Sequence, residues 1–258
     1  MLLVLSPAKS LDFETPPHIK TSTQPQFIPQ SSALMKLLSE YDVPQLSQLM
    51  HISDKLAALN VARNSEWKAK FDETNAKQAI LAFDGDVYTG FDATSLSARE
   101  LNHAQKVVRT LSGLYGILRP LDLMRPYRLE MGTQLANKKG KDLYAFWGDT
   151  LARHLNHELD AHKSKYLINL ASDEYFKAVS VKSFKHPILQ PIFQDHKNGT
   201  YKIISFFAKR ARGVMARYIV QNKIDQPELL KGFTEDGYRF SSEKVAKNGV
   251  TQLVFVRD

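Results

Sequence analysis

The first five residues are all apolar, and such a run limits the folds that are open to the chain. Successive side chains of a strand point to opposite faces, so a strand of this composition must be covered on both faces. We therefore expect residues 1–5 to form a central strand of a sheet with helices on both sides. The apolar run at 79–83 predicts a second buried strand, and a further strand is expected at 166–170.

Helical patterns separate these expected strands. Ser97 and Glu100 form a capping box, and apolar residues follow at helical spacing, which predicts a helix over 98–110. Strands and helices that alternate without an internal repeat indicate an α/β fold with a mixed sheet. No linker-like segment divides the chain, so residues 1–258 are expected to form a single compact domain. Further helices are expected over 31–40, 44–50, 52–63 and 142–161, and from Asp173 onward.

Two Asn-Gly pairs, Asn198-Gly199 and Asn248-Gly249, are the strongest turn signals in the chain. This dipeptide favours the tight turn of a β-hairpin. The two predicted hairpins join strands near 189–195 and 201–207, and near 238–242 and 253–256, with a helix over 208–221 between them.

The helix expected over 208–221 separates apolar from cationic residues. No acidic residue occurs between 196 and 224, whereas the net charge of the whole chain is +8. A merely solvated face, which is the alternative, usually mixes in Glu or Asp as ion-pair partners. The acid-free face therefore favours an anionic partner, above all nucleic acid. Its cations are Lys209, Arg210, Arg212 and Arg217, and the opposite arc holds Ala211, Val214, Met215, Tyr218 and Ile219.

Gly213 lies in the cationic arc beside Ala216 and Val220, where small side chains leave a trough between the cations. Glycine destabilises a helix interior by about 0.5–1 kcal/mol relative to alanine, so it indicates close approach by another backbone or by a phosphate-sugar chain. Four cations on such a face predict contacts to phosphates, with little sequence specificity and steep salt dependence.

Candidate catalytic residues follow the expected strands. Lys9 comes just after the first strand, Asp84 and Asp86 after the second, and Asp173 and Glu174 after the third. Catalytic acids and anion-binding residues often occupy such strand ends. Ordinary turn chemistry at 84–86 and a favourable interaction of Asp173 and Glu174 with a helix dipole are the structural alternatives. Convergence of Lys9 with these carboxylates in one pocket would favour an enzyme.

Composition excludes several classes of protein. The chain has no cysteine, which excludes disulfides and thiolate metal sites. No apolar stretch approaches the roughly 20 residues of a membrane-spanning helix, and the first residues lack the pattern of an export signal. The eight histidines are scattered, so we expect no metal site and no cofactor. These features favour a soluble, cytoplasmic protein with no membrane partner, and we expect a monomer.

Basic residues also gather between the expected helices at 98–110 and 142–161. Arg119, Arg125 and Arg128 interleave with prolines and a tyrosine, and three lysines follow at 138–141. Either group could extend an electrostatic track for a nucleic-acid strand. A solvated loop explains the lysines equally well.

Taken in order, several segments closely resemble the YaaA peroxide-stress protein family over essentially the whole chain. Single segments are weak signals, but their order and spacing are highly specific. They are Ser6-Pro7-Ala8-Lys9 with Leu11-Asp12, and residues 52–57, 83–90, 111–122, 126–132, 146–149, 169–177 and 203–213.

The resemblance implies a cytosolic bacterial protein that limits hydrogen peroxide damage, notably by keeping unincorporated iron low. It also implies a single α/β domain with a positively charged cleft that binds DNA and contains a helix-hairpin-helix element. The helix at 98–110 followed by Gly113 and Gly116 is our candidate for that element, because glycines let backbone N–H groups approach phosphates. The sequence offers no iron site, so we expect an indirect effect on iron.

Two main hypotheses follow. The first is a DNA-binding protein of the peroxide-stress response that contacts the phosphates of duplex or distorted DNA. The second is an enzyme that acts on nucleotides or nucleic acid, with Lys9 holding phosphate and Asp84, Asp86 or Asp173 as base or metal ligand. A protein-interaction module is a third, less specific possibility.

Overall fold

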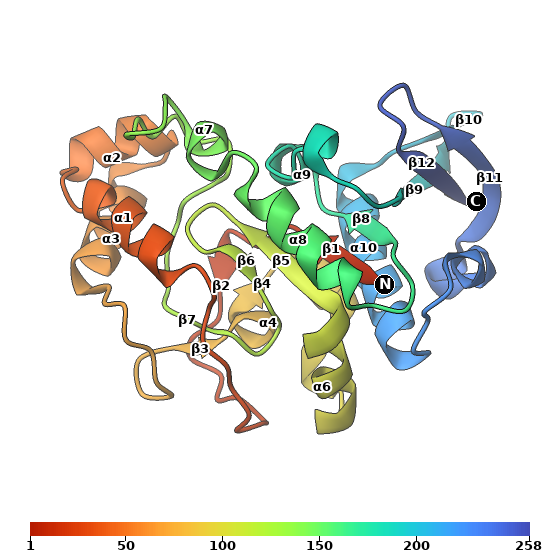
Figure 1. The fold of residues 1–258 in the computed structure, drawn as a ribbon, viewed down its shortest axis with the longest axis horizontal. Helices are drawn as coiled ribbons and strands as arrows, with labels where there is room; N and C mark the ends of the chain where they lie inside the picture. The colour runs from red at the N-terminus through yellow and green to blue at the C-terminus, as the bar shows by residue number, and fades with distance from the viewer.

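The computed structural model describes residues 1–258 and contains a mixed eight-stranded sheet (Figure 1). Strand β1 lies at its centre, buried over its whole length, and pairs in parallel with both β5 and β8. The predicted α/β class and the central place of residues 1–5 are therefore confirmed. Along the sheet the strands are β11 (Arg239–Val245), β12 (Thr251–Arg257), β9 (Ile188–Lys197), β8 (Leu167–Leu170), β1 (Leu2–Leu5), β5 (Val108–Ser112) and β6 (Gly116–Leu118), with β10 (Thr200–Lys202) paired to β9.

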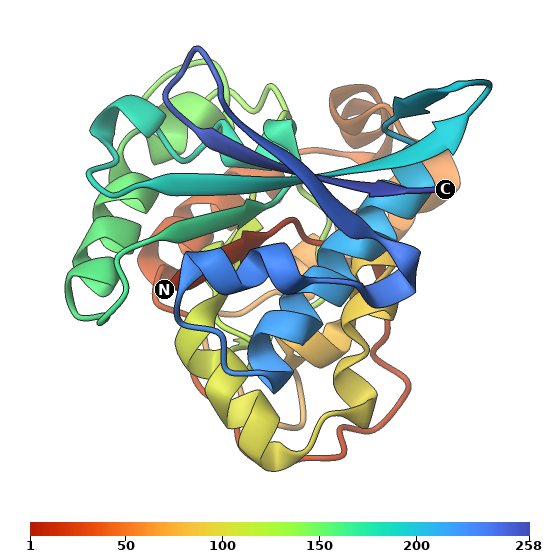
Figure 2. The same ribbon diagram turned by 90° about the vertical axis from the view of Figure 1, so that its right-hand side faces the viewer.

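Helices cover both faces of this sheet (Figure 2). Arg109 and Thr110 are neighbours on β5, so their side chains point to opposite faces. Arg109 binds Glu158 of helix α8 (Thr150–Asp160), whereas Thr110 Oγ1 lies 3.2 Å from the hydroxyl of Tyr88 in helix α5 (Asp86–Phe91). Helices α8 and α5 thus enclose the central strands from two sides, as the apolar composition of β1 requires.

The prediction of a strand at 79–83 is wrong. Residues 79–82 form the short helix α4 (Ala79–Ala82) between β3 (Lys77–Gln78) and β4 (Phe83–Asp84). All four helix residues are buried, and a short run that is buried on every side suits a helix as well as a strand. Strand β3 pairs with β7 (Leu123–Met124) and β4 pairs with β2 (Ser10–Leu11) in two small separate sheets.

Most predicted helices are present with shifted ends. Asp42 and Ser53 accept hydrogen bonds at the starts of the second and third helices. The helix expected over 142–161 is interrupted at Gly148, which has a φ of 48°. The helices are α1 (Ile28–Leu38), α2 (Val43–Met50), α3 (Asp54–Glu66), α6 (Ala98–Val107), α7 (Leu143–Trp147), α9 (Asp173–Phe176) and α10 (Ser205–Gln221), with 3-10 helices η1 (Ala93–Ser95), η2 (Val181–Ser183), η3 (Pro227–Gly232) and η4 (Glu235–Gly237). None of these helices combines the length and apolar character needed to cross a membrane.

The helix-hairpin-helix assignment at Gly113 and Gly116 is wrong. Helix α6 begins with the predicted capping box, but the chain after Val107 continues as β5, and the glycine turn joins β5 to the antiparallel β6. Both glycines are buried: a Cβ at Gly113 would overlap the carbonyl oxygen of Leu129, and one at Gly116 would lie 2.7 Å from the Trp147 ring. The two glycines serve internal packing and are not accessible to a phosphate.

Both Asn-Gly hairpins are confirmed. Asn198 and Gly199 have φ angles of 55° and 77° and connect β9 to β10, and Gly249 has a φ of 81° in the turn from β11 to β12. Helix α10 lies between the hairpins as predicted, although it begins at Ser205 rather than 208. Its early start takes residues 205–207 out of the expected strand, and residues 203–204 belong to neither a helix nor a strand.

Helix α10 packs directly against α5. Gly213, Ala216 and Val220 are buried, so the expected open trough between the cations is wrong. A Cβ at Gly213 would overlap the carbonyl oxygen of Val87, and a Cβ at Gly90 would overlap that of Arg210. The two glycines allow the backbones of α5 and α10 to touch, which was one of the two readings of Gly213.

Candidate functional site at the carboxyl ends of β1 and β8

The central strands place a candidate site at their carboxyl ends. The chain runs from β1 to β5 on one side and later returns to β8 on the other, so the strand order reverses at β1. Ligands of open α/β sheets bind in the crevice at such a switch point. The loops after β1 and β8 are joined there, because Ser172 N donates a 2.8 Å hydrogen bond to Ser6 Oγ and Ser6 Oγ donates a 3.2 Å bond to Ser172 Oγ.

A cavity of about 430 Å³ opens beside these loops, and we call it the switch-point cavity. Four segments that are distant in the sequence line it: the loop after β1, the start of α5, the start of α9 and the second and third turns of α10. Four of the five predicted catalytic residues, Lys9, Asp84, Asp86 and Glu174, therefore meet in one cavity. Asp173 is exposed beside it, while the adjacent Glu174 lines it. The charged lining residues are Lys9, Asp84, Asp86, Glu174, Lys209 and Arg212.

Arg212 is the least compensated cation of the cavity. Its half-buried guanidinium makes no hydrogen bond or ion pair. Burial lowers the pKa of Arg212, and the neighbouring charge of Asp173 acts in the opposite direction. Lys209 is exposed, and Lys9 Nζ lies 2.8 Å from Glu130 Oε2. A desolvated cation without a partner binds an incoming anion more strongly than a solvated one does.

Carboxylates face these cations. Gly132 N donates a 2.9 Å hydrogen bond to Glu174 Oε1, which fixes that side chain and leaves Oε2 free. Asp84 is exposed and Asp86 is half-buried at the first position of α5. The cavity therefore offers both cations, which attract an anionic group, and carboxylates, which accept hydrogen bonds from donors. No group of three or more His, Asp or Glu side chains in the structure is arranged to hold a metal ion.

The other two cations of α10 are engaged within the protein. Arg210 Nε lies 3.0 Å from Asp236 Oδ2. Arg217 Nη1 donates to the carbonyl oxygens of Phe91 and Asp92 at 3.0 and 2.8 Å and lies 3.4 Å from the Asp92 carboxylate. The stretch that lacks acids in the sequence thus meets acids in space, and of the four cations only Lys209 and Arg212 make no ion pair.

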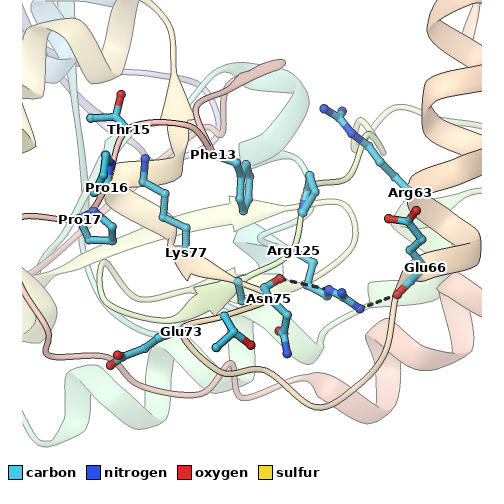
Figure 3. Close-up of a pocket in the computed structure, with 13 residues that line it drawn as sticks. Phe13, Thr15, Pro16, Pro17, Arg63, Glu66, Glu73, Asn75, Lys77 and Arg125 are labelled. Atoms are coloured by element: carbon cyan, nitrogen blue, oxygen red, sulfur yellow. Dashed lines mark hydrogen bonds between the residues drawn. The ribbon is translucent and has the colours of Figure 1, made fainter.

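The arginines at 119–128 do not form one continuous track. Arg119 binds the buried Asp122 at 2.8 Å, and Arg128 lies 3.1 Å from Glu130. Arg125 borders a separate pocket of about 320 Å³, where it donates to the carbonyl oxygens of Asn75 and Glu66 (Figure 3). Arg125 and Arg119, which also donates to the carbonyl oxygen of Gln24, link distant segments, whereas Arg128 pairs within its own segment.

Sequence reasoning missed an exposed aromatic pair at the start of α10. Phe206 is 57% exposed and Ile203 54%, although both were expected in a strand. Phe206 and Phe207 lie edge to face, with ring centroids 5.7 Å apart, and the Arg257 guanidinium lies 4.7 Å from the Phe207 ring. Adjacent phenylalanines directly before a run of cations were the available signal. Phe206 is one helical turn from Lys209, so it lies near the switch-point cavity.

The sequence is similar to known bacterial proteins along its full length. A family model described as peroxide stress protein YaaA matches residues 1–244. A UPF0246 protein of Janthinobacterium sp. (strain Marseille) is 57% identical over 242 residues, which is 94% of each chain. A UPF0246 protein of Pseudoalteromonas translucida is 54% identical over 258 residues, covering 100% of this chain and 99% of the relative.

Proposed function

Because the chain belongs to the family of the peroxide stress protein YaaA, we propose that it protects the cell against hydrogen peroxide by binding DNA. The family places the chain in the oxidative stress response. In our proposal the switch-point cavity and the exposed start of α10 contact the phosphate backbone with little sequence specificity. Iron-dependent damage is then limited by occupancy of DNA, without a resident iron site.

Arg212 is the observation that carries this proposal. It is half-buried, makes no ion pair and shares a cavity with Lys9 and Lys209. Partial burial of this arginine costs desolvation energy, and no ion pair within the protein offsets that cost. A bound phosphate supplies the missing partner through charge-assisted hydrogen bonds, for which the guanidinium geometry is well suited.

Removal of both unpaired cations tests the proposal. We expect the double variant Lys209→Ala, Arg212→Ala to bind duplex DNA at least about 100-fold more weakly, because each of the two charge-assisted contacts contributes about 1.5–3 kcal/mol. The slope of log K against log salt concentration should become shallower by about 2, since each lost phosphate contact removes ~0.9. Fluorescence anisotropy at several salt concentrations measures both quantities.

The matched control removes two charges elsewhere. Lys36 and Lys55 are exposed on α1 and α3, away from the cavity. Their replacement by alanine changes the net charge equally, so an effect of total charge alone would appear in both double variants. Equal affinity and equal salt slope in the two variants would remove the cavity from the proposal.

The carboxylates of the same cavity favour a second candidate, an enzyme that acts on a nucleotide or on nucleic acid. With phosphate on Lys9, Lys209 or Arg212, the carboxylate of Asp86 or Glu174 can accept a proton from an attacking water molecule. The oxygen of that water forms the new bond to the reacting centre, and the leaving group departs with its bonding electrons. Lys9, Asp84 and Asp86 line one cavity and Asp173 does not, so this partial convergence supports the second candidate.

Turnover of labelled oligonucleotides and nucleotides tests this second candidate. If the wild-type protein has activity, Asp86→Asn or Glu174→Gln should lower the rate by about 10²–10⁴-fold while DNA binding persists. Glu40→Gln is the control, because Glu40 is exposed just after α1. Absence of turnover in the wild type, or equal rates in all variants, would leave DNA binding alone.

A further inference from the structure

The switch-point cavity contains both signs of charge, and this limits what it can hold. Three cations, Lys9, Lys209 and Arg212, attract an anion. Three carboxylates, Asp84, Asp86 and Glu174, repel an anion that fills the same space. An inorganic phosphate satisfies only the first set. A ligand with a phosphate at one end and N–H or O–H donors at the other satisfies both.

We propose that the switch-point cavity binds one whole nucleotide, with its phosphate at Arg212 and Lys209 and its base at Glu174. The inference rests on the proposed binding of DNA phosphates and adds a specific subsite for the base. The cavity volume of about 430 Å³ lies within the roughly 300–1,000 Å³ range of small-ligand sites.

Glu174 is fixed in an orientation that suits it to hold the base. Its Oε1 accepts the hydrogen bond from Gly132 N. A Cβ at position 132 would lie only 3.2 Å from that oxygen, so the glycine leaves room for the Glu174 carboxylate. Oε2 makes no hydrogen bond within the protein. A carboxylate with one free oxygen accepts a hydrogen bond from a base amino group, as acidic residues do in reading cytosine.

The nucleotide can come from two sources, namely a free nucleotide or one extruded from a bound strand. Phe206 makes the second source structurally accessible, because this exposed ring lies one turn from Lys209 on α10 and is backed by Phe207. An apolar side chain can occupy the gap that an extruded base leaves in a stack. The same subsite then serves both sources.

Calorimetric titration with deoxyadenosine and deoxycytidine monophosphates and with deoxyribose 5-phosphate tests the base subsite. We expect the nucleotides to bind about tenfold more tightly than the sugar phosphate, because a hydrogen bond to a charged carboxylate is involved. Glu174→Gln should reduce this difference in affinity between nucleotides and sugar phosphate. The affinity for the sugar phosphate itself should change little. Arg212→Ala should lower the affinity for all three ligands, because each of them carries the phosphate.

A duplex carrying one 2-aminopurine distinguishes the second source. Extrusion of that base raises its fluorescence, and we expect Phe206→Ala to reduce the rise while Leu229→Ala, at a residue 51% exposed on η3, leaves it unchanged. A rise in fluorescence that depends on Phe206 supports the base subsite, with a bound DNA strand as the source of the nucleotide. Nucleotide preference without a rise supports the subsite with a free nucleotide as the source.

Two results separate failure of this inference from failure of DNA binding. Duplex affinity that depends on Lys209 and Arg212, combined with equal affinity for nucleotides and sugar phosphate and no fluorescence rise, overturns the base subsite alone. Absence of duplex binding, with nucleotide preference retained, overturns the proposed function and keeps the cavity as a site for a free nucleotide. Folding of each variant is checked by its thermal unfolding.

Discussion

Replacement of Gly213 by alanine is expected to lower the free energy of unfolding by about 3 kcal/mol, which is at the upper end of overpacking effects. The added Cβ would overlap the carbonyl oxygen of Val87 and come within 2.8 Å of Phe91 N. Both atoms belong to the backbone of α5, so no side-chain rotation relieves the clash. Helices α5 and α10 must instead move apart.

The sign of this effect separates the two explanations of the glycine. In a helix with an open face, alanine would stabilise the protein by about 0.5–1 kcal/mol relative to glycine. In the structure, tight packing against α5 outweighs that preference. Urea unfolding of wild type and variant measures the difference, and a variant as stable as the wild type would show that the helices do not touch at Gly213.

Gly232→Ala is the matched control for the glycine prediction. Its backbone φ is not in the left-handed region, and an added Cβ would meet only the Tyr218 hydroxyl at 3.7 Å, an ordinary contact. We expect a change within about 0.5 kcal/mol. Because Asp86 and Arg212 lie on α5 and α10, the Gly213 variant should also bind DNA less tightly.

Replacement of Arg109 by methionine is expected to lower the free energy of unfolding by about 3–5 kcal/mol at pH 7. Arg109 is only 4% exposed, and its Nε and Nη2 atoms donate to the two oxygens of Glu158 at 2.8 and 3.0 Å. Methionine fills similar space without the charge. The substitution therefore leaves the carboxylate of Glu158 partly buried and poorly compensated.

The pH dependence of this loss identifies its cause. Burial tends to raise the pKa of Glu158, but interactions with His154 and Arg109 outweigh burial and lower the pKa to about 2. A depressed folded-state pKa stabilises the protein above the ordinary carboxyl pKa of 4.5, and this contribution disappears as pH falls from there toward 2. We expect the difference between wild type and Arg109→Met to shrink over that range.

Urea unfolding at pH 7 and at several pH values from 4.5 down toward 2 measures this change. Arg239→Met is the control, because Arg239 and Asp258 form an ion pair with side chains 53% and 68% exposed. Exposed pairs contribute about 0–1 kcal/mol, so this variant should remain close to the wild type. A pH-independent loss in Arg109→Met would attribute the effect to packing rather than to the buried charge.

The elements that local chemistry specifies could be predicted from the sequence. Residues 1–5 are apolar on both faces, and they form the centre of the sheet. The Asn-Gly turns and the Ser97 capping box act within a few residues of the chain, so their outcome does not depend on distant partners. Local sequence also predicted the end of the first strand, which Lys9 follows, and the start of the helix that contains Glu174.

The prediction was wrong where burial overrides local pattern. Residues 79–82 are apolar without periodicity, and a four-residue run of this kind can be helix or strand. Residues 108–112 extend the helical pattern of α6, yet they pair with β1 and form β5. In both segments pairing with distant strands or packing against them decides the conformation.

The sequence by itself determined that the chain is an α/β protein with cations on α10 and carboxylates after its strands. Only the tertiary structure decided which of these charges are free. Arg210 and Arg217 form ion pairs with Asp236 and Asp92. Lys209 and Arg212 make no ion pair and line the switch-point cavity, together with Lys9, Asp86 and Glu174. The physical reason is that a charge is compensated by neighbours in space, and those neighbours lie far away along the chain.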